Sequence, residues 1–250
     1  MAFTLHTHSG FRPPPPTEQY RISLALNEET VRDAQRLRFE VFNLEMDEGL
    51  EQSVESGLDQ DEFDPVCDHL IVELVETGEV IGTYRLQTGP TARDHFGYYS
   101  EREFVFEPFE PFRAEILELG RACVAKNHRN LAVLGLLWKG LARYARHNRS
   151  RYMIGCSSLT SRNPADGPAL YDSLPSKWLA AAPYRTVPHP ELICEGGNEP
   201  SSPPKVPRLM KGYLLQGAQV CGPPALDGAF GTIDFLTIMD VRNIPSRYFH

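Results

Sequence analysis

The chain contains no run of apolar residues long enough to cross a membrane. Hydrophobic residues make up 41% of its 250 residues, yet no stretch approaches the roughly 18 to 20 consecutive apolar residues that a spanning helix needs. The N-terminal segment MAFTLHTHSGFRPPPP also lacks the apolar core of a signal peptide. The sequence therefore predicts a soluble, cytoplasmic protein with enough apolar residues for an ordinary core.

Cysteine is scarce, and several common functional motifs are missing. The five cysteines are widely spaced, odd in number and never form a Cys-x-x-Cys pair, so neither a disulfide framework nor a zinc ribbon is indicated. The sequence has no GxxxxGKS/T or GxGxxG phosphate loop. His6 and His8 fall in a Pro-rich leader, where solvated side chains are a simpler interpretation than a metal site. We expect reduced thiols and no metal.

Charge of one sign is missing from two long segments. Between Phe39 and Tyr84 there is no Lys or Arg and acidic residues are crowded, whereas between Leu119 and Ala165 there is no Asp or Glu and basic residues recur. The net charge of -8 argues against a nucleic-acid partner. The acidic segment suits a cation and the basic segment an anion, although charge runs often only solvate a surface.

Hydrophobic periodicity predicts strands that alternate with helices after an extended or disordered leader (1–19). Asn27 should cap the first helix, and the dipeptide Thr77-Gly78 should turn a hairpin. Strands are predicted over 20–26, 69–76, 80–87, 114–124, 151–159 and 232–241, and helices after residue 27, over 126–148, over 167–182 with an interruption at Pro175, and over 209–216. The stripe of the long basic helix comprises Leu134, Leu137, Trp138, Leu141 and Ala145. This order indicates one domain of the α/β or α+β class.

The stretch AEILELGRACV (114–124) is typical of a buried strand, but two charges interrupt it. A buried charge without a partner is costly, so Glu118 and Arg121 serve either the fold or chemistry. A bulge at Gly120 would turn both side chains toward one site. A structural ion pair between them is the alternative. Cys123 could be an activated thiolate, although a small buried cysteine in a strand is usually inert.

Seven motifs, in order, carry a family resemblance: RLRFEVF, DEFDPVCDHL, GTYRL, ELGRACV, GLLWKGLARY, GYLLQGAQV and IDFLTIMDV. They resemble the GNAT-fold acyltransferases often labelled hemolysin-like, whose best-known members are ornithine N-acyltransferases that use acyl-acyl carrier protein. The resemblance covers about Arg36 to Tyr248. A weaker resemblance to acyl-homoserine lactone synthases rests on their pattern of helix Arg and Phe, paired aspartates, strand Arg and Glu-x-x-Arg. The matching residues are Arg38, Phe42, Asp61, Asp64, Arg85, Glu118 and Arg121.

The resemblance implies a single GNAT-like domain (20–250) with a mixed, mostly antiparallel central sheet flanked by helices. The strand ending near Cys123 would splay from that starting near Tyr152, and the donor's pantetheine would lie in the gap. Its expected contacts are Ala122, Cys123, Val124, Arg129 and Asn130. Acetyl-CoA enzymes of this fold usually bind the pyrophosphate on a glycine-containing loop. The sequence RNLAVLG lacks that glycine pair, which favours an acyl-phosphopantetheine thioester on acyl carrier protein over CoA, with no tightly bound cofactor.

The resemblance also implies roles for the charged residues. Glu118 would take the proton of the attacking amine, directly or through water, while Arg121 anchors the substrate or holds Glu118. The acceptor would be bound by Arg38, Phe42, Asp61, Asp64 and Arg85, with the aspartates on its ammonium groups and an arginine on its carboxylate. Helix capping, or ion pairs between these residues, is the alternative. The dock for an acidic carrier protein would comprise Arg143, Arg146, Arg149 and Arg151.

The sequence thus predicts an N-acyltransferase that moves a long acyl chain from acyl-acyl carrier protein to the amine of an amino acid such as ornithine. It would act in the cytoplasm, with peripheral association at the inner membrane face left open. The alternatives are an acyl-homoserine lactone synthase, an acetyl-CoA-dependent acetyltransferase and, in another class, a non-catalytic acyl-binding protein.

Overall fold

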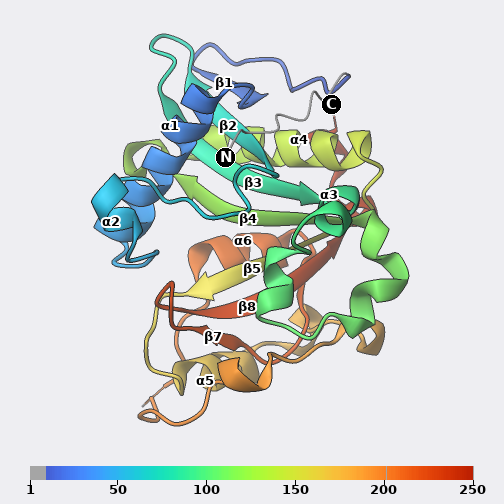
Figure 1. The fold of residues 1–250 in the computed structure, drawn as a ribbon. Coiled ribbons are helices and arrows are strands. Elements are labelled where there is room, and N and C mark those ends of the chain that lie inside the picture. Colours follow the sequence, from blue (N-terminus) through green and yellow to red (C-terminus); the bar gives the residue numbers. More distant parts are fainter. Residues whose placement is uncertain (1–9, 201, 250) are drawn as a thin grey trace.

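A single open sheet of eight strands runs through the molecule (Figure 1). The strands are β1 (Tyr20–Leu24), β2 (Asp68–Leu74), β3 (Val80–Thr88), β4 (Ile116–Val124), β5 (Tyr152–Leu159), β6 (Gln219–Val220), β7 (Ala225–Asp227) and β8 (Thr232–Asp240). The computed structural model describes residues 10–200 and 202–249. Within those ranges the spatial order is β1-β2-β3-β4-β5-β8-β6, with β7 also on β8. Only β4 and β5 pair in parallel among these strands, which confirms the predicted mixed, mostly antiparallel sheet.

The helices lie on both faces of this sheet. They are α1 (Glu28–Phe39), α2 (Ser53–Ser56), α3 (Gly89–Asp94), α4 (Leu131–His147), α5 (Asp166–Ser173) and α6 (Arg208–Leu215). Asn27 caps α1 as predicted, because its side-chain oxygen accepts a hydrogen bond from the N–H of Thr30 at 2.9 Å. A π-helical turn over Glu40–Glu45 extends α1 into the acidic segment. In the described part of the chain, no helix is long and apolar enough to cross a membrane.

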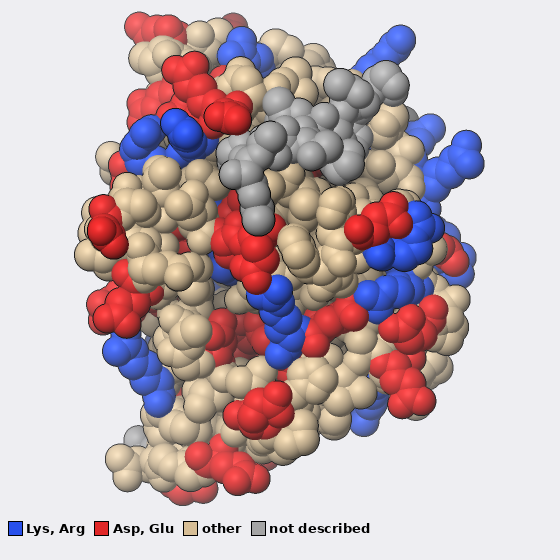
Figure 2. All heavy atoms as spheres, in the orientation of Figure 1, with Lys and Arg blue, Asp and Glu red and all other residues tan. Residues whose placement is uncertain are grey.

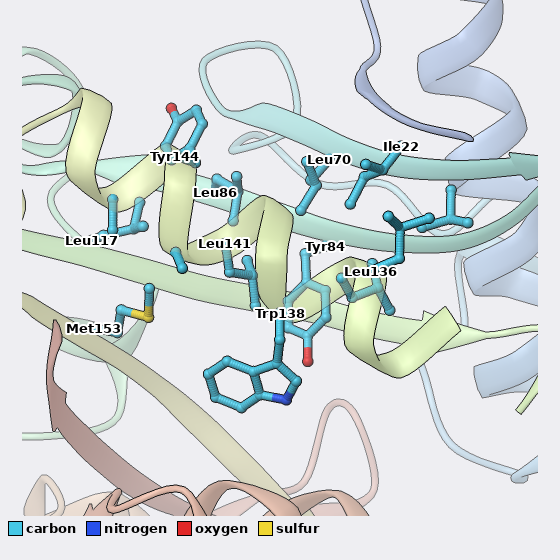
Figure 3. Packing of buried hydrophobic residues seen from close by; sticks show 14 of the residues in the cluster. Ile22, Leu70, Tyr84, Leu86, Leu117, Leu136, Trp138, Leu141, Tyr144 and Met153 are labelled. Carbon is cyan, nitrogen blue, oxygen red and sulfur yellow. The ribbon is translucent and has the colours of Figure 1, made fainter. Parts of the chain in front are cut away.

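Helix α4 packs against β1, β2, β3 and β4 through one apolar cluster (Figure 3). Leu136 and Leu141 of α4 lie among Ile22, Leu70 and Leu86 of the strands. Burying a leucine side chain contributes about 1.5–3 kcal/mol, so this cluster fixes the helix on the sheet. The predicted apolar stripe is buried except for Leu134, which is 38% exposed.

The two faces of β5 and β8 are covered by different segments. On one face, Ile154 and Leu236 pack under an aromatic segment between β3 and β4 that includes Phe104 and Phe109; it is drawn green in front of these strands in Figure 1. On the other face, Phe235 packs with residues of α5 and α6. The predicted helix over 167–182 is shorter than expected, because α5 ends at Ser173 just before Pro175, and the strands β6 and β7 were not predicted.

The described part of the Pro-rich leader is packed on the domain. Residues 10–19 form no helix or strand, but the Phe11 ring lies 5.8 Å from the Tyr144 ring of α4. The guanidinium of Arg143 donates a hydrogen bond to the carbonyl of Pro13 at 3.1 Å. Phe11 and Pro13 thus contact α4; residues 1–9 lie outside the described ranges.

Close approach of β4 and β5 depends on Gly155. A Cβ atom added to Gly155 would lie 2.3 Å from the carbonyl oxygen of Leu119, a backbone atom that cannot rotate away. We therefore expect Gly155→Ala to lower the unfolding free energy by about 1–3 kcal/mol, as overpacking does. Gly135 of α4 has open space around it, so Gly135→Ala should raise stability by about 0.5–1 kcal/mol. Chemical denaturation of both variants tests this; a Gly155→Ala variant as stable as the wild type would contradict it.

Candidate active site

A cleft opens where β4 and β5 part. Their parallel pairing runs from Ile116 opposite Tyr152 to Glu118 opposite Ile154 and goes no further, although both strands continue. A cavity of about 760 Å³ lies at this point, lined by residues of β4, β5, β8, α4 and α6. The splayed strands that the resemblance implied are therefore present.

The cleft passes through the sheet from one face to the other. Because successive residues of a strand point to opposite faces, Met153 and Met239 join the apolar cluster under α4, whereas Cys156 and Asp234 point the other way, toward Glu103. Cys156, Asp234 and both methionines line the cleft. Its wall is therefore mainly apolar on the face of α4 and α6, and on the opposite face it carries acidic residues beside apolar ones such as Phe42 and Phe230.

Helix α6 closes the apolar side. Its Tyr213 hydroxyl lies 2.5 Å from the Tyr84 hydroxyl of β3, and its ring packs at 5.9 Å against Trp138 of α4. Leu137 and Met210 complete this wall. The space between α4 and α6 thus offers a mainly apolar channel, in which the hydroxyls of Tyr84 and Tyr213 are bonded to each other.

A bulge in β4 falls at Arg121. Thr83 of β3 pairs with Cys123, and Arg85 pairs with Gly120, so two residues of β4 lie opposite one of β3. Arg121 has a φ of 47°, a left-handed conformation that non-glycine residues adopt at a cost of order 1–3 kcal/mol. The sequence predicted a bulge at Gly120, and the structure places the unusual backbone one residue later.

Glu118 lines the cleft, and both oxygens of its buried carboxylate accept hydrogen bonds. Oε2 accepts from the N–H of Tyr99 at 2.7 Å, and Oε1 accepts from the N–H and hydroxyl of Ser100 at 2.9 and 2.6 Å. Burial raises the pKa of Glu118, and the bonds from Ser100 and Tyr99 offset only part of that rise. The alternative ion pair between Glu118 and Arg121 is not found among the described residues; Arg121 pairs elsewhere.

Three arginines and three aspartates form one buried network beside the cleft. Arg38 of α1 binds Asp64 through two nitrogens, at 2.8 and 3.0 Å, and Asp59 at 2.7 Å. Asp61 accepts from Arg85 at 2.5 Å and from Arg121 at 3.1 Å. Arg121 also lies 3.3 Å from Asp59. The positive and negative charges are equal in number and offset one another. We call these six residues the ionic network: Arg38, Asp59, Asp61, Asp64, Arg85 and Arg121.

The residues predicted to bind the amino-acid acceptor fall into two groups, those that line the cleft and those buried inside the ionic network. Phe42, Arg85 and Arg121 line the cleft, and the Phe42 ring packs at 5.4 Å on Phe230. Arg38 and Asp64 are fully buried by one another and by other groups of the network, and neither they nor Asp61 lines the cleft. Their position matches the structural alternative, ion pairs between these residues, and gives no support to direct contact with an acceptor.

The residues predicted for the pantetheine all line the cleft: Ala122, Cys123, Val124, Arg129 and Asn130. Asn130 caps α4, and its side-chain oxygen accepts from the N–H groups of Ala132 and Val133, both at 3.0 Å. Arg129 forms a two-pronged ion pair with Glu45 at 2.6 and 2.7 Å. Burial raises the pKa of the Cys123 thiol, so this thiol stays protonated, in keeping with an inert cysteine.

The arginines predicted to dock a carrier protein lie away from the cleft. Arg143 and Arg146 are on the last turns of α4 and Arg149 and Arg151 follow it, whereas the residues of α4 that line the cleft end at Trp138. The five residues from Trp138 to Arg143 span roughly 7.5 Å of helix. None of the four arginines lines the cleft, so their position does not support the predicted dock.

The cleft also contains acidic residues that the sequence did not single out. Glu48, Asp227 and Asp234 line it, and Glu103 lies directly behind Cys156 and Asp234. The sequence did contain a signal for Asp234, because this residue interrupts the apolar strand TIDFLTIMDV just as Glu118 interrupts the apolar strand over 114–124. On the face shown in Figure 2, acidic and basic side chains are interspersed, so the charge segregation along the chain does not produce surfaces of one sign there.

These features define an acyltransferase with a GNAT fold. A family model described as an acetyltransferase (GNAT) domain matches residues 37–139. A protein of Brucella abortus named L-ornithine N(alpha)-acyltransferase is 33% identical over 243 residues, which cover 91% of this chain and 86% of the relative. One of the same name from Agrobacterium fabrum is 34% identical, over 90% and 82%. The chain belongs to the family of these L-ornithine N(alpha)-acyltransferases.

Solved structures of low sequence identity share the fold. The acyl-homoserine lactone synthase LasI has a TM-score of 0.53 at 12% identity, over 89% of this chain and 90% of that one. FeeM, an N-acyl amino acid synthase from uncultured soil microbes, has a TM-score of 0.54 at 11% identity with the same coverage. At such identities the likeness bears on the fold alone.

The ionic network should be essential for stability. Asp64→Asn leaves Arg38 with one anionic partner fewer in a fully buried position, and breaking a buried pair costs about 3–5 kcal/mol. Asp33→Asn is a matched control on α1, where Asp33 pairs with Arg36 at 2.6 Å on the exposed surface; it should cost less than about 1 kcal/mol. Urea denaturation measures both, and equal losses would contradict a special role for the buried network.

The same network should set the acid limit of the fold. Burial alone would raise the pKa values of Asp61 and Asp64, but the neighbouring arginines lower both. A carboxylate with a lowered pKa stabilises the fold above its unfolded value of about 3.9 and loses this contribution as the pH falls toward the folded value. The stability difference between wild type and Asp64→Asn should therefore be constant above about pH 4 and shrink below it. A difference unchanged from pH 5 to pH 3 would contradict this account.

Proposed function

We propose that this enzyme transfers a long acyl chain from an acyl carrier protein thioester to the α-amine of ornithine or a similar amino acid. The observation that carries the proposal is the cleft through the sheet, which is mainly apolar on one face and carries buried acidic residues on the other. A long chain fits the side of α4 and α6, and a charged amino acid fits the side of Glu118 and Asp234. The names of the relatives specify the α-amine of L-ornithine.

The thioester would lie at the point where the strands part. Beyond Glu118 and Ile154, the edges of β4 and β5 no longer bond to each other, so N–H groups of β4 face the cleft and are available to a developing oxyanion. The amine attacks the thioester carbonyl, the C–N bond forms, and the C–S bond breaks to release the pantetheine thiol. A base must accept the proton of the amine. We assign this role to Glu118, directly or through water, while Arg121 fixes the bulge.

The capped start of α4 favours a carrier protein as donor. CoA enzymes use free N–H groups at a helix start for the pyrophosphate, but here the Asn130 side chain already accepts from Ala132 and Val133. A carrier-bound phosphopantetheine has a single phosphate and therefore needs fewer N–H donors at this site. Mass spectrometry of products from acyl carrier proteins charged with different chains, offered with a panel of amino acids, tests the proposal. Failure to acylate any amine, with binding of acyl chains retained, would favour a non-catalytic acyl-binding protein.

Replacement of Glu118 tests its role as base. Glu118→Gln keeps the shape but removes the base, so turnover should fall about 10²- to 10⁴-fold. The companion Ser100→Ala removes one hydrogen bond that lowers the pKa of Glu118; the acidic limb of the pH–rate profile, where Glu118 must lose its proton to act as a base, should move to higher pH. Circular dichroism confirms folding. Retention of more than half the wild-type rate by Glu118→Gln at neutral pH would rule out the assignment.

The dock for the carrier protein should lie at the cleft mouth rather than at the far end of α4. Arg208 begins α6, is exposed and lines the cleft, so Arg208→Glu should weaken binding of the acidic carrier far more than binding of free acyl-pantetheine. Arg146→Glu makes the same charge change on the last turns of α4 and is the matched control. If Arg146→Glu has the larger effect on carrier binding, the dock lies where the sequence alone predicted it.

A further inference from the structure

Two buried carboxyl groups meet a thiol on the polar side of the cleft. One ligand atom from each of Glu103, Cys156 and Asp234 lies within 4.8 Å of the others. Glu103 and Asp234 are each 4% exposed. Asp234 accepts a hydrogen bond from the hydroxyl of Thr232 at 3.1 Å, and the Cys156 thiol donates to Oε2 of Glu103 at 3.5 Å. These contacts involve neutral groups and bring no positive charge to the two carboxyl groups.

The other oxygen of Glu103 has no partner. Oε1 is buried and makes no hydrogen bond to any described residue, although buried polar atoms are nearly always bonded. Glu103 and Asp234 also form no ion pair with any described residue, and the nearby Arg121 is committed to Asp59 and Asp61. This unpartnered acceptor lies directly behind Cys156 and Asp234, which line the cleft, so an ammonium group that reaches Asp234 would find it next to that carboxylate.

The acidic surroundings disfavour ionisation of both carboxyl groups. Burial raises the pKa of Asp234 to about 6, and burial with the charges of Asp234 and Asp227 raises the pKa of Glu103 well above its usual range. Glu118 and Arg121 of β4 also face this group, with opposite effects on its charge. A bound cation would favour the ionised form of both carboxyl groups and offset the cost of burying their charge.

We propose that Glu103 and Asp234 bind the side-chain ammonium of a diamino acid acceptor, and so direct acylation to the α-amine. A nitrogen placed between carboxylate oxygens no more than 4.8 Å apart can lie within about 2.7–2.9 Å of both, the range of charge-assisted hydrogen bonds. This inference rests on the proposed function and adds to it the residues that read the acceptor's side chain.

The position of this subsite suits such an acceptor. Cys156 lies two residues along β5 from Ile154, where pairing with β4 ends, and two residues of strand span roughly 6.6 Å. A side chain of three methylene groups covers a similar distance from the α-carbon to its terminal nitrogen. An amine held between two carboxylates stays protonated and has no lone pair for attack, so the α-amine alone remains to react.

Paired acceptors test the subsite. Norvaline has the same three-carbon side chain as ornithine but lacks its terminal amine. The wild-type enzyme should prefer ornithine in kcat/KM, and Glu103→Gln and Asp234→Asn should each reduce that preference by about tenfold or more, as expected for a charged hydrogen bond. Wild-type enzyme that uses both acceptors equally, or variants that lose both activities in proportion, would overturn the inference.

A matched variant and a stability measurement separate binding from folding. Asp240→Asn removes a charge from the other end of β8, where Asp240 pairs with Arg242 and Arg151, and should leave the ornithine preference unchanged. Because burial opposes ionisation of Asp234 in the empty site, Asp234→Asn should not lower the melting temperature. A purely structural role would instead lower the melting temperature and leave the preference intact.

A metal ion is the rival occupant. Metal analysis of the purified enzyme is expected to find no stoichiometric divalent ion; finding one that Glu103→Gln abolishes would overturn the inference. If no amine is acylated at all, the proposed function fails, and calorimetric titration with ornithine and norvaline then decides the subsite alone. Tighter binding of ornithine that is lost in Asp234→Asn supports it, and absent or equal binding overturns it.

Discussion

The early end of parallel pairing between β4 and β5 is the constraint on which the site depends. Three residue pairs hold the strands together, and Gly155 allows the backbone of Leu119 to come close just after the last of these pairs. Beyond that point, β4 and β5 form no ladder hydrogen bonds with each other, and the space between them reaches both faces of the sheet. Helices α4 and α6 line this space with apolar side chains on one face, and buried acids line it on the other.

Opening the sheet has an energetic cost, and the ion pairs of the ionic network offset part of it. Arg121 sits in an unfavourable backbone conformation at the bulge, and its guanidinium is held by Asp59 and Asp61. Aromatic rings of Tyr99 and Phe230 lie 5.0 and 4.6 Å from it. The same aromatic segment provides the N–H groups that bind Glu118. The ionic network, of which Arg85 and Arg121 themselves line the cleft, therefore holds this part of the cleft wall in place.

Much of this arrangement could be predicted from sequence where the signal is local. Residues only a few positions apart determine three of the predicted features: the helix cap at Asn27, the hairpin around Gly78 and the charged strand around Glu118. The contacts of Arg38 with Asp64 were harder, because residues 26 apart could equally bind a substrate or each other. Glu103 and Asp234 were missed because their proximity arises only when the aromatic segment folds over β8. The basic end of α4 was placed correctly on its helix, but composition does not reveal its distance from a cleft.

A cleft that crosses a sheet constrains how a product can leave. An acylated amino acid would have its charged head on one face and its hydrocarbon tail on the other, with the new amide between the strands. Neither end can be drawn through to the opposite face without passing an environment of the wrong polarity. The open route runs along the strands, past the ends of β4 and β5, where the residues proposed to contact a pantetheine arm also line the cleft. Departure of the carrier would then have to precede departure of the product, so the order of release follows from the shape of the sheet.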